Sequence, residues 1–185
     1  MRTIAVTAFL FILIAGFAAA QVPTSGNVFF GYSYYNANVG GQRTSLNGWN
    51  GSIEGKFLPF IGVVADFSGY YGSQNFPTCA VPLGVPQGCV ISNNNFTEHN
   101  YLFGPRVSVS VGKIRPFAEV LIGAGHIHVN GGGSDTAFAT AVGGGIDYKL
   151  LRLLGLRVQG DYIHTDLFNL PQNNARISTG LVVHF

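Results

Sequence analysis

We single out nine charged residues within the apolar segments of the chain, because their types suit either acid–base catalysis or ion pairing. They are Glu54, Asp66, Glu119, Asp147 and Asp161 on the acidic side and Lys56, Arg106, Arg157 and Arg176 on the basic side. Paired carboxylates serve glycosidases and acid proteases as general acid and base. Each carboxylate here has a cation available as a partner, so we predict a structural ion-pair network and no enzyme active site. The alternative is a narrow gated pore, in which re-pairing of these charges opens a path for water.

The histidines are the second chemically capable group. His126 and His128 share one face of an extended segment, at a spacing that suits a single metal ion. We favour interfacial histidines near a barrel rim, together with His99 and His164, and we expect no metal and no cofactor. An enzyme acting on lipid A would need a serine beside a histidine on the same face, and His126-Ile127-His128 offers none.

Strands are the elements that must position these side chains. Residues 175–185 show this most clearly, because two sets of side chains alternate there with a period of two. One set is Ala175, Ile177, Thr179, Leu181, Val183 and Phe185, and the other is Arg176, Ser178, Gly180, Val182 and His184. Similar patterns predict about eight strands, at residues 26–37, 46–57, 60–71, 97–109, 115–128, 137–148, 154–164 and 175–185. We therefore predict an all-β fold, an antiparallel up-and-down transmembrane β-barrel.

Charges and glycines fall on the same face of each predicted strand. In a membrane barrel of about eight strands this face points inward, where packed side chains leave no open channel. We expect polar side chains to fill the interior and the charges to form two layers. The first sets Glu54, Glu119 and Asp147 against Lys56, Arg106 and Arg157, and the second sets Asp66 and Asp161 against Arg176. An unpaired buried charge is costly, so the near-equal numbers of the two signs favour pairing.

The connections between the predicted strands alternate in length. Residues 58–59, 110–114 and 149–153 are short connections, whereas residues 38–45, 72–96, 129–136 and 165–174 are longer and rich in Gly, Asn and Ser. Outer-membrane barrels have short periplasmic turns and longer extracellular loops. We therefore predict four extracellular loops, with the loop of residues 72–96 as the main contact surface.

The composition also favours an exported membrane protein. Only 10% of residues are charged, against roughly 25% in soluble domains. Residues 1–20 predict a cleaved signal peptide, because Arg2 precedes an apolar stretch and Ala18-Ala19-Ala20 supplies a cleavage site. The stretch is short for a spanning helix, which needs about 20 apolar residues. Residues 21–185 then form the barrel domain, and they carry no basic face that would indicate nucleic acid as a partner.

The two cysteines of the chain, Cys79 and Cys89, both lie in the predicted loop of residues 72–96. An even number of cysteines in an exported loop predicts a disulfide. Two thiols alone make an incomplete metal site.

Basic residues gather at the predicted periplasmic turns. They are Lys113, Arg115, Lys149 and Arg152. We expect solvated turn charges, and the alternative is weak docking of a periplasmic partner.

A family resemblance rests on the signal sequence and four further segments. These are Phe29-Phe30-Gly31-Tyr32-Ser33-Tyr34, Gly143-Gly144-Gly145-Ile146-Asp147-Tyr148, Arg157 with Asp161-Tyr162, and Gly180-Leu181-Val182-Val183-His184-Phe185. The chain resembles the small outer-membrane β-barrel family and is similar to the transmembrane domain of outer-membrane protein A. The resemblance implies residence in the bacterial outer membrane, contact with its lipid and lipopolysaccharide, and an assembly signal at Phe185 that the barrel-assembly machinery reads. Two-domain members continue into a peptidoglycan-binding domain, which we do not expect here.

These features together predict a non-enzymatic outer-membrane scaffold. Its extracellular loops would serve envelope integrity, adhesion or recognition by an extracellular ligand. The alternatives are the narrow gated pore for ions or small solutes, a soluble periplasmic barrel of the lipocalin type, and an enzyme of the barrel rim that acts on lipid A.

Overall fold

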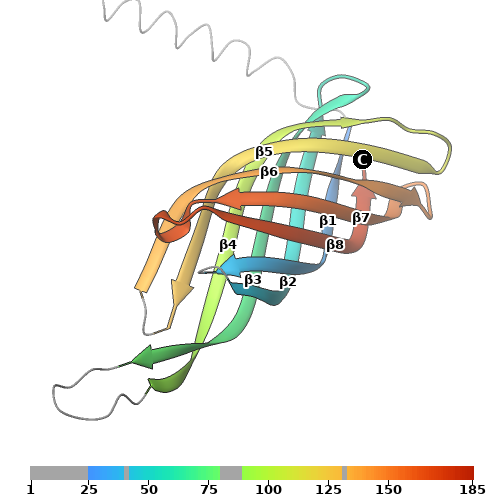
Figure 1. The fold of residues 1–185 in the computed structure, drawn as a ribbon. Helices are drawn as coiled ribbons and strands as arrows, with labels where there is room; N and C mark the ends of the chain where they lie inside the picture. Colours follow the sequence, from blue (N-terminus) through green and yellow to red (C-terminus); the bar gives the residue numbers. More distant parts are fainter. Residues whose placement is uncertain (1–24, 40–41, 80–88, 131–132) are drawn as a thin grey trace, which may run out of the picture.

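The computed structural model describes residues 25–39, 42–79, 89–130 and 133–185. Within these residues, eight antiparallel strands form a closed barrel in chain order (Figure 1). The strands are β1 (Gly26–Val39), β2 (Gln42–Lys56), β3 (Ile61–Cys79), β4 (Cys89–Ser108), β5 (Ile114–Val129), β6 (Gly133–Lys149), β7 (Leu154–Thr165) and β8 (Gln172–His184). Pairing of β1 with β8 closes the sheet. The predicted up-and-down barrel is confirmed, while the predicted signal peptide, residues 1–20, lies outside the described residues.

Side chains alternate across the barrel wall, as the period of two predicts. On β8, Ile177, Leu181 and Val183 are exposed, whereas Arg176 and Ser178 are buried. The same holds on β5, where Val120 is 52% exposed and the neighbouring Glu119 is 2% exposed. The outer face is therefore apolar and the inner face carries the charges, which is the polarity of a barrel surrounded by hydrocarbon.

The two ends of the barrel differ. Short turns at residues 57–60, 109–113 and 150–153 join the strands at one end, which we call the short-turn end. Gly26 and Phe185 also meet there through two backbone hydrogen bonds of 2.9 and 3.1 Å. The connections at the opposite end include η1 (Leu167–Asn169), a single 3-10 turn. Among the described residues, no helix has the length and apolarity needed to cross a membrane.

A long hairpin projects from the end opposite the short turns (Figure 1). Pairing of β3 with β2 stops at Tyr71, and pairing of β4 with β5 stops at Phe96. Beyond these residues β3 and β4 still pair with each other, through seven further positions that run from Ser73 opposite Asn95 to Cys79 opposite Cys89. The prediction of an irregular loop over residues 72–96 is therefore wrong for residues 72–79 and 89–96, which continue as paired strands. We call this projecting part the β3–β4 hairpin, and its barrel end the hairpin end.

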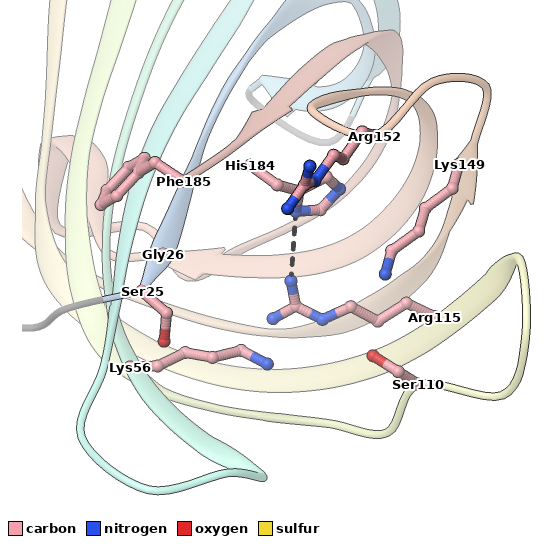
Figure 2. A pocket seen from close by; sticks show the side chains of 9 residues that line it. All are labelled: Ser25, Gly26, Lys56, Ser110, Arg115, Lys149, Arg152, His184 and Phe185. Carbon is pink, nitrogen blue, oxygen red and sulfur yellow. Dashed lines mark hydrogen bonds between the residues drawn. The ribbon is translucent and has the colours of Figure 1, made fainter.

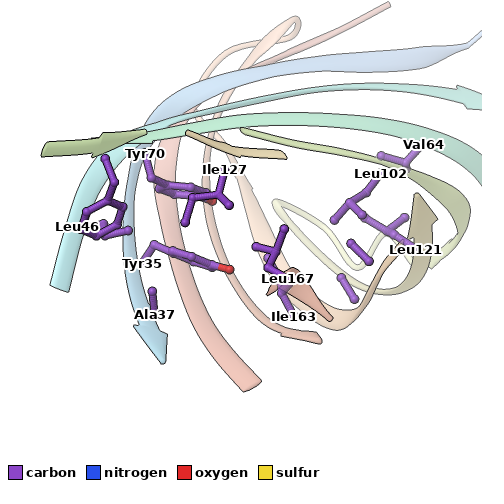
Figure 3. Packing of buried hydrophobic residues seen from close by; sticks show 13 residues of the cluster. Tyr35, Ala37, Leu46, Val64, Tyr70, Leu102, Leu121, Ile127, Ile163 and Leu167 are labelled. Atoms are coloured by element: carbon purple, nitrogen blue, oxygen red, sulfur yellow. The ribbon is translucent and has the colours of Figure 1, made fainter. Parts of the chain in front are cut away.

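An apolar cluster fills the interior toward the hairpin end (Figure 3). Its members are Tyr35, Ala37, Leu46, Val64, Tyr70, Phe96, Leu102, Leu121, Ile127, Ala139, Ala141, Ile163 and Leu167. The rings of Tyr35 and Tyr70 stack at 4.2 Å between centroids. The expectation that polar side chains fill the interior is thus wrong for this part of the barrel. Apolar side chains on the inner face are removed from water by close packing against one another, just as those on the outer face are by lipid.

Candidate functional site

The first layer of ion pairs lies toward the short turns, and Glu54 is at its centre. Its carboxylate lies 3.3 Å from Arg106 and 2.8 Å from Arg115, and it accepts a hydrogen bond of 2.6 Å from Asn27. The three charged side chains come from β2, β4 and β5 and are at most 4% exposed. The Glu54 carboxylate on β2 therefore links β4 and β5 across the inside of the barrel.

Two further pairs complete this first layer. Arg106 contacts Glu119 at 2.5 Å, and Arg157 binds Asp147 through two hydrogen bonds of 2.6 and 2.9 Å. The Phe117 ring lies between the two arginines, with the guanidinium carbons 4.3 and 4.7 Å from its centroid. Two-point Arg–carboxylate pairs and cation–π contacts fix guanidinium orientation, so this layer is rigid as well as neutralised.

A second layer is centred on Arg176. Its guanidinium lies 2.6 Å from Asp66 and 2.7 Å from Asp161, and all three side chains are buried. Gln159 joins the two layers, because its amide donates to Glu119 at 2.8 Å and to Asp161 at 3.0 Å. Arg176 therefore contacts both aspartates of the second layer.

Two residues of the short-turn end differ from the expectation. Lys56 forms no ion pair among the described residues, and its Nζ lies 3.5 Å from the Pro59 carbonyl oxygen. Arg115, expected as a solvated turn charge, is instead buried and paired with Glu54. The positions of the two residues on their strands explain why Arg115 takes the place in the ion-pair layer that was predicted for Lys56. Lys56 is the last residue of β2, at the barrel mouth, whereas Arg115 is the second residue of β5 and points inward.

Glu98 is a buried carboxylate that the sequence analysis did not single out. It accepts hydrogen bonds from the Tyr35 hydroxyl at 2.9 Å and from Asn100 at 3.2 Å. Asn174 in turn donates to the Tyr35 oxygen at 2.7 Å. No cation lies within 4 Å of Glu98 among the described residues. A signal was available, because Glu98 shares the strand face of Arg106 at an even spacing.

The four histidines expected near the rim lie on or near the outer surface. His99 and His126 occupy opposite positions on β4 and β5, and His126 Nδ1 lies 2.7 Å from Thr136 Oγ1. His164 makes a contact of the same length with Asn173, and His128 is exposed. Within the described part of the chain, no three His, Cys, Asp or Glu side chains gather as metal ligands would.

The backbone pairing gives the positions of the two cysteines and of Phe185. Cys79 and Cys89 stand opposite each other at the end of the β3–β4 hairpin, although their side chains lie outside those that the structure describes. The disulfide therefore stays a prediction. Phe185 is 58% exposed beside the seam between β1 and β8, and its role as an assembly signal likewise stays a prediction.

Comparison with known proteins identifies the fold. No protein-family model matches the chain, and no curated protein matches it. Among solved structures, the Neisserial surface protein A superimposes with a TM-score of 0.67 and 12% identity, over 86% of this chain and 97% of that one. Ail, the attachment invasion locus protein of Yersinia pestis, superimposes with a TM-score of 0.58 and 14% identity, over 89% and 100%. A second structure of Ail, with the heparin analogue sucrose octasulfate, gives 0.56 and 16%, over 87% and 98%.

These similarities, together with the apolar exterior, define the class of protein. The chain is a small eight-stranded β-barrel of the bacterial outer-membrane type. The predicted resemblance and fold class are confirmed, and the predicted location agrees with that of the structural neighbours. At identities of 12 to 16% the comparison shows the fold alone.

Proposed function

We propose that this protein is a non-enzymatic scaffold of the outer membrane, with a closed interior and an extracellular hairpin that makes contacts outside the cell. The observation that carries the proposal is the packing across the lumen. Ion pairs join β2, β3, β4, β5, β6, β7 and β8 in two layers, and the apolar cluster fills the remaining interior. Opening such an interior would require buried charges to separate at a cost of several kcal/mol each.

The β3–β4 hairpin is the surface that we propose for recognition or adhesion. It extends seven paired positions past its neighbours, about 23 Å at roughly 3.3 Å per residue. Its sequence over residues 72–96 contains four Asn and three Pro and no charged residue. A disulfide between Cys79 and Cys89 would join the two strands where the described pairing ends, and would reduce the conformational entropy lost on binding. The name of Ail, an attachment and invasion protein of this fold, gives the proposal a precedent.

The remaining partners follow from the membrane setting. Outer-membrane lipid would surround the apolar face, and lipopolysaccharide would surround the extracellular part. We expect the barrel-assembly machinery to engage the last strand through Phe185. The proposal needs no cofactor and no nucleic acid.

A comparison of two loop variants with the parent protein tests the scaffold proposal. Replacement of residues 73–95 by a two-residue Asn-Gly turn should abolish adhesion of producing bacteria to epithelial monolayers. A control with residues 168–171, which follow the buried Leu167, replaced by a Gly-Ser linker of equal length should retain it. Heat-modifiable gel mobility shows that each barrel is folded. Equal adhesion of all variants and of cells without the protein would contradict the proposed role.

Conductance separates the scaffold from the gated pore. The purified protein in planar bilayers should show no steady ion-conducting events, because the paired charges and the apolar cluster occupy the lumen. Reproducible open states whose conductance changes in Arg176→Met would favour the pore.

A further inference from the structure

A cationic cavity opens at the short-turn end of the barrel (Figure 2). Its volume is about 160 Å³, and four basic side chains line it together with His184. The four are Lys56, Arg115, Lys149 and Arg152. They come from the end of β2, the start of β5, the end of β6 and the following turn, so barrel closure and not local sequence gathers them. None of the residues that line the cavity is Asp or Glu.

The charge of this cavity is incompletely neutralised by the protein. Arg115 is paired with Glu54 at 2.8 Å, whereas Lys56, Lys149 and Arg152 form no ion pair among the described residues. Like charges at short range repel one another, and a bound anion relieves that repulsion. Figure 2 shows the Lys56, Lys149 and Arg115 side chains directed into the same hollow.

Two buried nitrogen atoms of residues that line the cavity have no hydrogen-bond partner among the described residues. Arg115 is 4% exposed, and its Nε has no hydrogen-bond partner in the structure. The buried Nε2 of His184 also has none, although its Nδ1 lies 3.5 Å from Arg115. A buried donor without an acceptor is destabilising, so a ligand oxygen that accepts a hydrogen bond from either atom would stabilise the site.

We propose that this cavity binds a phosphate group. Arginine and lysine donors arranged around one hollow suit the several oxygens of phosphate, and the hydroxyls of Ser25 and Ser110 line the same space. A single water needs about 10–15 Å³ of such space, so the cavity has room for a phosphate. This binding site lies at the end of the barrel opposite the hairpin and is independent of the function proposed above.

The phosphate could come from two sources. One is free phosphate or a soluble phosphate ester of the periplasm, since the short turns of outer-membrane barrels lie there. The other is the headgroup of a neighbouring phospholipid. Phe185 lines the cavity and is 58% exposed, so the cavity adjoins the lipid-facing surface.

The test uses the full mature protein, folded in a non-ionic detergent without phosphate. Inorganic phosphate is titrated and followed by calorimetry and by the ³¹P NMR linewidth. We expect saturable binding, weakened about tenfold by Lys149→Gln and by Arg152→Gln, which corresponds to about 1.4 kcal/mol for one charged contact. Lys113→Gln is the matched control, because Lys113 is an exposed cation of the same end that does not line the cavity.

The outcomes are distinct. Affinity that is unchanged in Lys113→Gln and weakened about tenfold in each of the two cavity variants supports the site. Displacement of phosphate by dihexanoyl phosphatidylglycerol below its micelle concentration would identify the lipid headgroup as the source, and its failure to displace phosphate would identify the free anion. No saturation at millimolar phosphate, or equal weakening by Lys113→Gln, would overturn the proposal.

Discussion

Replacing Arg176 by methionine removes the cation on which the second interior layer depends. The guanidinium is fully buried between Asp66 at 2.6 Å and Asp161 at 2.7 Å, and methionine fills most of its volume without its charge. Breaking a buried pair costs about 3–5 kcal/mol because the remaining charge is left uncompensated. Asp66 keeps a hydrogen bond from Asn50 and Asp161 keeps those from Gln159, so we expect about 3–4 kcal/mol.

The assay is reversible urea unfolding in lipid vesicles. Trp49 is the single tryptophan of the chain and lies on β2 beside the Phe30 ring, so its fluorescence reports transfer of the outer wall into water. The free energy of unfolding is compared between the parent and Arg176→Met. Arg43→Met is the matched control: Arg43 is exposed on the same barrel and bonds only to Asn36 among the described residues, so its loss should cost under about 1 kcal/mol.

A triple variant distinguishes lost charge pairing from lost packing. Adding Asp66→Asn and Asp161→Asn to Arg176→Met removes all three charges, and we expect most of the lost stability to return, because neutral replacement of a buried ion cluster is often without cost. A loss below 1 kcal/mol for Arg176→Met, or no recovery in the triple variant, would refute the ion-pair reasoning.

Three further predictions concern the wall and the interior. Val120→Arg places a charge on the lipid-facing side of β5 and should lower stability by about 2–4 kcal/mol near mid-bilayer in the same vesicle assay, whereas insensitivity would argue against lipid contact. Glu54→Gln should cost about 3 kcal/mol because it leaves two arginines under-neutralised, while Glu98→Gln should be nearly neutral because no described cation faces it; equal effects would contradict this difference. Gly180→Val should block barrel closure and the heat-modifiable gel shift, because a Cβ at Gly180 would lie 2.4 Å from the Gly31 backbone, and a normal shift would show that the seam tolerates it.

The wall of the barrel was predictable because a period of two is a local property. Arg176 and Leu181 lie five positions apart, and the pattern alone assigns them to opposite faces, as the structure has them. Near-continuous alternation in the other segments gave the number of strands for the same reason. The pattern also placed Glu98 and Leu121 on the inner face. Their roles were missed because we expected a polar interior, whereas a small barrel fills its lumen with any side chains that pack well, apolar ones included.

Three features of the structure could not be predicted from the local sequence pattern. The β3–β4 hairpin runs through Asn, Ser and Pro77, which have low strand propensity, and only the partner strand makes them extended. The fate of Arg115 depended on where β5 begins, because a shift of one residue would have turned its side chain outward. The cationic cavity is the third, since Lys56, Arg115 and the turn that carries Lys149 and Arg152 are far apart in sequence and meet only when the barrel closes.

The central claim is that the apolar face of the barrel contacts hydrocarbon while the charges remain inside. Quenching of Trp49 fluorescence by brominated phospholipids tests it most directly in the unmodified protein, because Trp49 lies on the outer side of β2 next to the exposed Phe30. We predict strong quenching by lipids brominated along the acyl chain and weak quenching by aqueous acrylamide. Strong acrylamide quenching with no effect of brominated lipid would contradict the claim.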